Sequence, residues 1–308
     1  MKLRILLNTS SLAPSVSACF SHSQHARRDV SPLQRRILSP VGKTVITNIS
    51  VFDGYEMTPS RTVIIEGEKN GSYDTRCQRH GTFHYLIPGL IDSHLHLNVP
   101  SHLEVLTSYG ITTAFQMSCH NDTQCAMFKG HPDLCDSSLQ AYQPSGQAVI
   151  TQAVDYVFSN NSDYFKITVE TNGPSPSSQA ELVPAAHDIG QQTMSHCADM
   201  KSYLQTIESG SNGLQHIPQN GILNTSAIEQ MLRQHQYTTP TMTVFEYDLS
   251  NTQAAARLGA NGSFEYGRAN VALLHSFGVP ILAGTDAAGT ITARWPILRA
   301  RWILRRYG

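Results

Sequence analysis

Short apolar segments alternate with helix-like segments from residue 88 onward, and this alternation constrains the fold more than any other feature. The strand candidates are residues 89–97, 111–117, 147–153, 164–170, 192–198, 213–217, 237–245 and 279–287. The helix candidates are residues 101–110, 178–190, 199–210, 225–236 and 269–278. Four of these helices reach a glycine, the usual residue after a helix, at Gly110, Gly190, Gly210 and Gly278. Eight strands alternating with helices predict an α/β fold of the (β/α)8 TIM-like barrel type, and a doubly wound open sheet is the alternative.

Residues 41–87 have a different pattern, in which apolar and polar residues alternate in short segments. The first segment ends at Asp53-Gly54, a dipeptide typical of turns. This pattern predicts a small antiparallel β module, which we interpret as an incomplete N-terminal β-sandwich module. The predicted organisation is a leader or targeting segment, the β module, the barrel and an atypical basic tail, at residues 1–40, 41–87, 88–290 and 291–308.

The charges are distributed unevenly along the chain, although the net charge is only −1. Residues 1–36 hold six basic residues and one acid, and residues 294–308 hold five arginines and no acid. Removing both ends from the 22 basic and 23 acidic residues leaves 11 bases and 22 acids, a net charge of −11. An acidic body repels a phosphate backbone, so no nucleic-acid partner is expected. No apolar run approaches the ~20 residues of a membrane helix, so no membrane partner is expected either.

The amino-terminal end resembles a targeting segment, with basic "MKLR", a weak apolar stretch and small residues before Cys19. A transit peptide and a misplaced gene start are the alternatives. Asn-x-Ser/Thr sequences, which matter only in a secreted chain, occur at Asn8, Asn48, Asn70, Asn121, Asn160, Asn224 and Asn261. They favour secretion and glycosylation, and cytoplasmic and mitochondrial locations are the alternatives.

The six cysteines contain no C-x-x-C pair, which excludes a zinc ribbon or thioredoxin-like site. Cys119, Cys125 and Cys135 lie close together in sequence. Two of them could form a disulfide in a secreted chain, and free buried thiols are equally compatible with the pattern.

Two histidines, His94 and His96, end the first strand candidate of the barrel. Residues i and i+2 of a strand point to the same face, so both imidazoles can bind one metal ion. A pair of core histidines without a metal is the alternative.

Lys166 occupies an unusual position in the strand candidate 164–170. Phe165, Ile167 and Val169 share the face expected to meet the helices, so Lys166 points into the barrel. A buried ammonium is costly, which favours a neutral amine or a carbamate formed with CO2. The alternative is a lysine that extends from the strand end to solvent.

Three more polar residues, His196, His216 and Asp286, end the fifth, sixth and eighth strand candidates. Each alone is compatible with a core histidine or a helix-capping aspartate. Together with His94, His96 and Lys166 they fall at the C-terminal strand ends, where barrel enzymes keep their active sites. Substrate specificity is expected from the loops 98–103, 118–145 and 171–178, in which no pattern names a substrate.

Seven sequence motifs carry or flank these polar residues. They are "PGLIDSHLHL", "YGITTAFQM", "YFKITVE", "AAHDIGQQTMSHC", "GLQHI", "TPTMTVF" and "FGVPILAGTDA". Over residues 44–290 the chain resembles the amidohydrolase superfamily of metal-dependent hydrolases. Within it, the chain is most similar to the imidazolonepropionase-like and Xaa-Pro dipeptidase-like branch.

The resemblance implies two divalent metal ions, with zinc the expected metal. His94, His96 and Asp286 would bind one ion, and His196 and His216 the other. Lys166, carboxylated by CO2, would bridge them. A metal-bridging hydroxide would attack a C–N bond of a small-molecule amide or dipeptide-like substrate, with Asp286 as the catalytic general acid and base.

Two other functions remain as alternatives. A mononuclear zinc deaminase of the same superfamily would use His94, His96, His196 and Asp286 and would need no carbamate on Lys166. An inactive, truncated remnant is the third reading, because the resemblance ends at "GTDAAG" and a basic tail follows. The oligomeric state cannot be inferred from the sequence.

Overall fold

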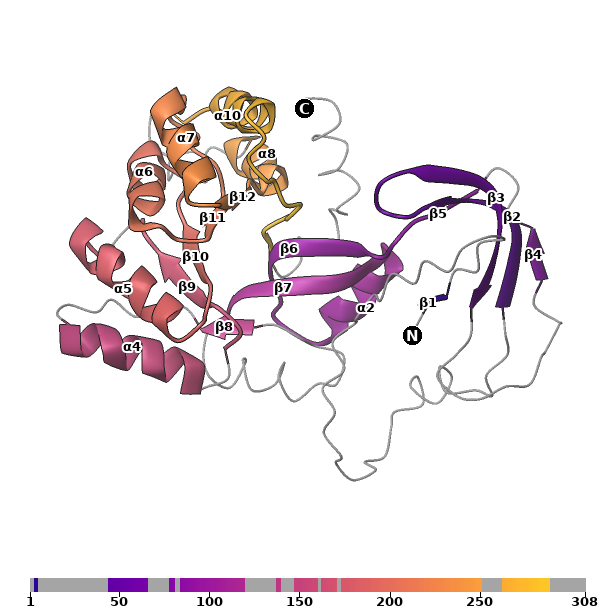
Figure 1. Cartoon of the computed structure of the whole chain (residues 1–308), viewed down its shortest axis with the longest axis horizontal. Helices are drawn as coiled ribbons and strands as arrows, with labels where there is room; N and C mark the ends of the chain where they lie inside the picture. Colours follow the sequence, from indigo (N-terminus) through magenta and orange to yellow (C-terminus); the bar gives the residue numbers. More distant parts are fainter. Residues whose placement is uncertain are drawn as a thin grey trace. The chain divides into compact units, whose positions relative to one another are not determined.

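The computed structural model describes residues 3–4, 44–65, 78–80, 84–119, 137–139, 147–159, 162–170, 173–250 and 262–288. The chain divides into two compact units, Met1–Gly89 and Leu90–Gly308 (Figure 1). The predictions about most of the leader 1–40, most of the loop 118–145 and the tail 291–308 lie outside the described residues. So do Cys19, Cys77, Cys125 and Cys135 and the sequons at Asn8, Asn70, Asn121, Asn160 and Asn261.

The first unit contains one mixed β-sheet. Its strands are β1 (Leu3–Arg4), β2 (Thr44–Phe52), β3 (Met57–Ile65), β4 (Gln78–His80) and β5 (Tyr85–Leu86). They follow the order β1-β3-β2-β4, and β5 also pairs with β2. β2 pairs antiparallel with β3, as predicted, but parallel with β4 and β5. The prediction of a wholly antiparallel module is therefore wrong, because β4 and β5 run in the same direction as the β2 strand with which they pair.

The turn between β2 and β3 is built by Asp53 and Gly54. The Asp53 carboxylate accepts hydrogen bonds from the backbone N–H groups of Tyr55 and Glu56, at 2.9 and 3.0 Å. Gly54 has φ of 112°, a conformation that side-chain-bearing residues rarely adopt. The Asp-Gly pair thus forms the hairpin turn that the sequence predicted.

The second unit alternates strands and helices. Its elements are β6 (Leu90–His96), α2 (Ser101–Ser108), β7 (Ile111–Cys119), β8 (Ser137–Leu139), α4 (Gln147–Ser159), β9 (Phe165–Thr168), α5 (Pro176–Asp188), β10 (Thr193–His196), α6 (Met200–Ser209), β11 (Gly213–Gln215), α7 (Thr225–Arg233), β12 (Tyr237–Thr239), α8 (Met242–Ser250), α10 (Phe264–Ser276) and β13 (Ala287–Ala288). The strands form two parallel four-stranded sheets, of order β12-β11-β10-β9 and β13-β6-β7-β8. The α/β class is confirmed.

The segment 280–288 links these two sheets. Thr238 of β12 exchanges backbone hydrogen bonds with Pro280 and Leu282, at 3.0 and 2.8 Å. Farther along, Asp286 donates its N–H to the His94 carbonyl of β6 at 2.7 Å. Within the described residues no strand pairing joins β8 to β9. Closure into a (β/α)8 barrel therefore stays a prediction.

The five predicted helices are confirmed as α2, α5, α6, α7 and α10. Side chains of Ser175, Asp199, Asn224 and Ser263 accept hydrogen bonds from the first turns of α5, α6, α7 and α10. The four glycines predicted to end helices all have left-handed φ, between 77° and 80°. None of the described helices is long and apolar enough to cross a membrane.

Three strand predictions are wrong or only partly right. Residues 147–153 belong to α4, because Ile150, Val154 and Val157 recur at helical spacing and are buried. The strand predicted at 237–245 ends at Thr239, and α8 follows after Pro240. The strand predicted at 279–287 contributes only an isolated bridge between Ile281 and Thr238 and the short β13.

The two faces of β9 differ as the sequence predicted. One face packs against α4 and α5 in a core cluster of Ile150, Val154, Val157, Phe165, Ile167, Val169, Leu182, Val183 and Ala186. Figure 1 shows these helices along one side of the β9–β12 sheet. Lys166 lies on the other face and is 3% exposed. The structure therefore confirms a buried lysine and excludes one that extends to solvent.

Candidate metal centre

The six predicted site residues come from five parts of the second unit. His94 and His96 lie in β6, Lys166 in β9, His196 in β10, His216 directly after β11, and Asp286 directly before β13. His216 and Asp286 have positive φ, 77° and 53°, although neither is glycine. Such backbone conformations are costly and concentrate at functional sites.

Asp286 forms one group with the two histidines of β6. The Asp286 Oδ1 atom lies 3.3 Å from His94 Nε2 and 3.1 Å from His96 Nε2. The three side chains offer ligand atoms that all lie within 4.8 Å of one another. Two imidazole nitrogens and a carboxylate oxygen are ligands that zinc accepts.

The His94 Nε2 atom shows that a cation fits this group. It is buried and has no assigned hydrogen-bond partner among the described residues, and Asp286 Oδ1 lies 3.3 Å away. An unpaired buried nitrogen costs free energy, and a bound metal would remove that cost. The residues present therefore fit a metal ion.

His196 and His216 form a second group. The His196 Nδ1 atom lies 2.7 Å from His216 Nε2, and the ring centroids are 4.1 Å apart. The His216 ring lies 4.7 Å from that of His94, between centroids. The two groups are thus adjacent.

In each of the four histidines, the ring nitrogen that does not face another site residue lies near an oxygen atom. The pairs are His94 Nδ1 with Gln215 Oε1 at 2.7 Å, His96 Nδ1 with Ser118 Oγ at 3.1 Å, His216 Nδ1 with Thr241 Oγ1 at 2.7 Å, and His196 Nε2 with Glu170 Oε2 at 3.5 Å. The Gln215 carbonyl oxygen only accepts, so His94 carries its proton on Nδ1 and keeps the Nε2 lone pair for a metal. Such outer partners orient metal-binding histidines in proteins.

The electrostatic environment keeps the buried ligands in metal-binding form. Burial, with the nearby Lys166 charge, lowers the pKa of His94 to about 3. Burial and the neighbouring His196 also lower the pKa of His216. Burial alone would raise the pKa of Asp286, but His94, His96 and His216 outweigh it and hold that pKa well below its usual range. At neutral pH the buried His94 and His216 are therefore neutral imidazoles, and Asp286 is a carboxylate.

The Lys166 amine has no hydrogen-bond partner among the described residues. Burial lowers its pKa to about 8. It lies near enough to His94 and His216 for its charge to lower their pKa values. The amine is thus partly neutral near physiological pH, as reaction with CO2 requires.

Sequence reasoning missed the residues that hold the predicted set in place. The clearest is Asp92, which is 0% exposed. Its carboxylate accepts hydrogen bonds from the Thr285 hydroxyl at 2.6 Å and from the N–H groups of Thr285 and His94, both at 3.1 Å. Burial raises the pKa of Asp92 to about 7. Its position two residues before His94 was the available signal, because it shares the face of the strand that carries the histidines.

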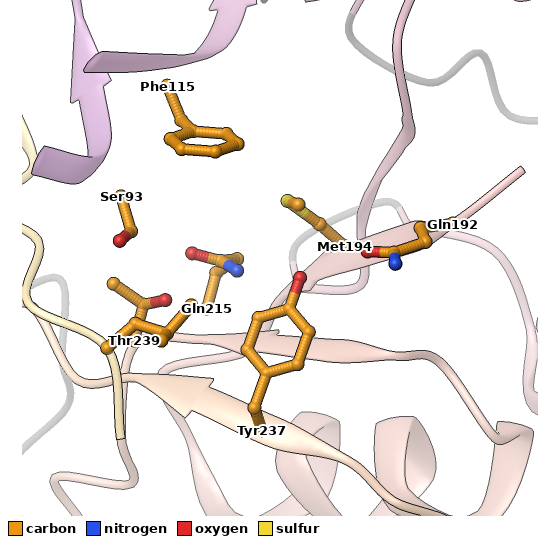
Figure 2. Close-up of a pocket in the computed structure, with 8 residues that line it drawn as sticks. Ser93, Phe115, Gln192, Met194, Gln215, Tyr237 and Thr239 are labelled. Atoms are coloured by element: carbon orange, nitrogen blue, oxygen red, sulfur yellow. The ribbon is translucent and has the colours of Figure 1, made fainter. Parts of the chain in front are cut away.

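A cavity of about 250 Å³ lies beside Gln215, the residue that contacts His94 Nδ1 (Figure 2). It is lined by Ser93, Phe115, Gln192, Met194, Gln215, Tyr237, Thr239 and Leu282. Figure 2 shows the Tyr237 hydroxyl pointing between Met194 and Gln215. Burial raises the pKa of Tyr237 to about 12, so this hydroxyl stays protonated.

Comparison with solved structures finds the same fold in several hydrolases. A Xaa-Pro dipeptidase with bound methionine matches at 16% identity, over 86% of this chain and 84% of that one, with a TM-score of 0.69. Ochratoxinase from A. niger matches at 15% identity, over 87% and 81%, with a TM-score of 0.64. A prolidase complexed with N-methylphosphonate-L-proline matches at 14% identity, over 82% and 80%, with a TM-score of 0.63.

No family model and no curated protein sequence matches this chain. The structural likenesses cover most of both chains, at sequence identities that show the fold alone. The protein therefore has the fold of Xaa-Pro dipeptidase, prolidase and amidohydrolase structures, which agrees with the resemblance of its sequence motifs.

Proposed function

We propose that this protein is a metal-dependent hydrolase that cleaves a C–N bond in a small amide or dipeptide-like substrate. The observation that carries the proposal is the pattern of ring nitrogens at the site. Every one of the four histidines has one nitrogen near an oxygen atom and the other directed toward a neighbouring ligand. Histidines held only for packing have no reason to share this pattern.

Two divalent ions, with zinc the preferred metal, fit these residues. His94, His96 and Asp286 would hold one ion, His196 and His216 would hold the other, and a carbamate on Lys166 would bridge them. The buried, unpaired Lys166 amine supports this role, because a bridging carbamate would give it partners. When bound, such ions polarise a carbonyl group and ionise water near neutral pH.

Asp286 is the residue that would move the proton. Its carboxylate is held ionised by the surrounding histidines, so it can accept a proton from water. It can then donate that proton to the leaving nitrogen, which would otherwise depart as an unstable anion. Its backbone N–H is bound to the His94 carbonyl at 2.7 Å, which keeps the carboxylate beside both histidines of β6.

The substrate proposal rests on structures of the same fold. One is a Xaa-Pro dipeptidase with bound methionine, and another is a prolidase complexed with N-methylphosphonate-L-proline. We therefore expect hydrolysis of dipeptides or N-acyl amino acids.

The test is hydrolysis of Xaa-Pro dipeptides and N-acyl amino acids by the purified chain, supplied with zinc and bicarbonate. We expect amine release that a chelator abolishes and that His94→Asn lowers at least ~100-fold. His275→Asn is the matched control, because His275 is exposed at the end of α10. Protein that binds no divalent metal and releases no amine would contradict the proposal.

A mononuclear deaminase is the second candidate. It is favoured by one observation, the direct 2.7 Å contact between His196 and His216, which leaves only His94, His96 and Asp286 as a compact metal-binding group among the described residues. Lys166→Ala separates the two candidates. A variant that keeps full activity with one metal per chain would establish the deaminase and exclude the binuclear site.

A further inference from the structure

We infer that Glu170 is a positioning residue, which fixes the tautomer of His196 and so prepares His196 Nδ1 to bind the second metal. The inference rests on the proposed function, because it assigns a role in the binuclear site. Glu170 lies just beyond β9, four residues after Lys166, and its side chain is 19% exposed.

The two oxygens of the Glu170 carboxylate have different partners. Oε1 accepts hydrogen bonds from the N–H groups of Ala198 and Asp199 and from the Ser202 hydroxyl, the last two at 2.9 and 3.1 Å. Oε2 faces His196 Nε2 at 3.5 Å. Three donors at the start of α6 thus fix the carboxylate, and the free oxygen is directed at the histidine.

This arrangement determines which His196 nitrogen carries the proton. A carboxylate can only accept, so the nitrogen that faces it, Nε2, must be the protonated one. A neutral imidazole then has its lone pair on Nδ1. That atom lies 2.7 Å from His216 Nε2, on the side of the proposed second metal. Glu170 therefore presents the correct atom of His196 as a ligand.

Glu170→Gln replaces the acceptor that faces His196 by a donor and hardly changes the size of the side chain. The three donors at Oε1 hold the amide oxygen there, because an amide nitrogen in that place would face three other donors. The amide nitrogen then takes the place of Oε2 and donates toward His196 Nε2. His196 must move its proton to Nδ1, and Nδ1 can no longer bind a metal.

The first measurement uses the wild-type protein without metal. Nitrogen-15 NMR distinguishes the two neutral histidine tautomers, and the His196 signal is identified by its loss in His196→Asn. We expect the Nε2–H tautomer in the wild type and the Nδ1–H tautomer in Glu170→Gln. An Nδ1–H tautomer in the wild type would overturn the inference, and this result needs no variant at Glu170 to fold.

The second measurement is zinc content at a series of free zinc concentrations. We expect two zinc ions per wild-type chain and a second site weakened about 10- to 100-fold in Glu170→Gln, with the first site unchanged. Glu208→Gln is the matched control, because it makes the same change at an exposed position of α6. It should keep two zinc ions at wild-type affinity.

The outcomes separate the inference from the proposed function. Equal affinity for two zinc ions in the wild type and Glu170→Gln would overturn the role of Glu170 and leave the proposed function standing. A wild-type chain that binds no zinc would contradict the proposed function, while the NMR measurement would still decide the tautomer of His196.

Discussion

Individual residues hold the candidate site by contacts that join distant parts of the sequence. Asp92 ties β6 to Thr285, next to Asp286. Gln215 of β11 contacts His94 of β6, and Glu170, just after β9, contacts His196 of β10. These contacts orient His94 and His196 and fix the position of the segment that carries Asp286.

Asp92→Ala is expected to lower the free energy of unfolding by about 2–4 kcal/mol, because it leaves buried N–H donors without an acceptor. Asp92→Asn should cost less, since the amide oxygen can still accept both backbone hydrogen bonds. Chemical denaturation of the metal-free protein measures both changes. Asp155→Ala on the exposed side of α4 is the control, with a change within about 0.5 kcal/mol. An Asp92→Ala variant as stable as this control would contradict the assigned role.

Tyr237 gives a prediction for alkaline pH. Burial raises its pKa from the ordinary tyrosine value of 10.0 to about 12. Its contribution to stability is therefore fully present below pH 10 and is lost as the pH rises through about 12. Tyr237→Phe should remove this loss, up to about 2 kcal/mol between these pH values. Equal pH dependence of unfolding in wild type and variant would show that the hydroxyl titrates normally.

The sequence predicted the candidate site residues, but it did not predict the residues that hold their side chains in place. His94 and His96 were recognisable because strand alternation places both side chains on one face of β6. Lys166 was recognisable because it lies opposite the apolar face of β9. Glu170 and Gln215 gave no such signal, because each acts on a histidine of a different strand. Only the packing of the strands reveals those contacts.

At the scale of elements, the segment 280–288 packs tightly between β12 and β6. Gly284 allows this close approach. A Cβ atom there would meet the Thr239 methyl group, and it would lie 2.8 Å from His94 Cβ and 3.0 Å from the His94 backbone nitrogen. The segment also carries Asp286, so its position determines where that carboxylate meets the histidines.

Gly284→Ala is expected to destabilise the protein by about 1–3 kcal/mol, because the added methyl group must displace β6. It should also weaken zinc binding, since His94 lies on the displaced strand. Gly221→Ala is the matched control, because its Cβ would meet only the flexible end of Met200, at 3.1 Å. Thermal unfolding and zinc titration measure both effects. Equal behaviour of the two variants would contradict the role assigned to Gly284.

Helices of this chain were easier to predict than its strands. Glycines after the helices and polar N-terminal residues mark the helix ends by local chemistry, as at Gly210 and Asp199. The segment 147–153 was misread because a short apolar run is compatible with both a strand and a helix. Its continuation to Ser159 and its packing on β9 decide for the helix.

At the scale of the whole molecule, the second unit brings the predicted ligands together from both of its sheets. His94 and His96 belong to one sheet, and Lys166 and His196 to the other. A metal bound to residues of both sheets would link them in addition to the segment 280–288. Metal binding would therefore be coupled to the stability of this unit.

Zinc is expected to raise the unfolding temperature of the chain, because a ligand that binds only the folded state stabilises it. At a free zinc concentration 100 times the dissociation constant, the gain is about 2.7 kcal/mol. Calorimetry with and without zinc measures this shift, and His94→Asn should reduce it. A chain without a cooperative transition, or one indifferent to zinc, would favour an inactive remnant.

The most direct test of the central claim is the metal content of the folded wild-type protein, measured by elemental analysis after gel filtration in zinc and bicarbonate. Two divalent ions per chain are predicted, held by the four histidines, Asp286 and the carbamate of Lys166. One ion per chain, unchanged in Lys166→Ala, would contradict the binuclear site. A folded protein without any divalent ion would contradict the account as a whole.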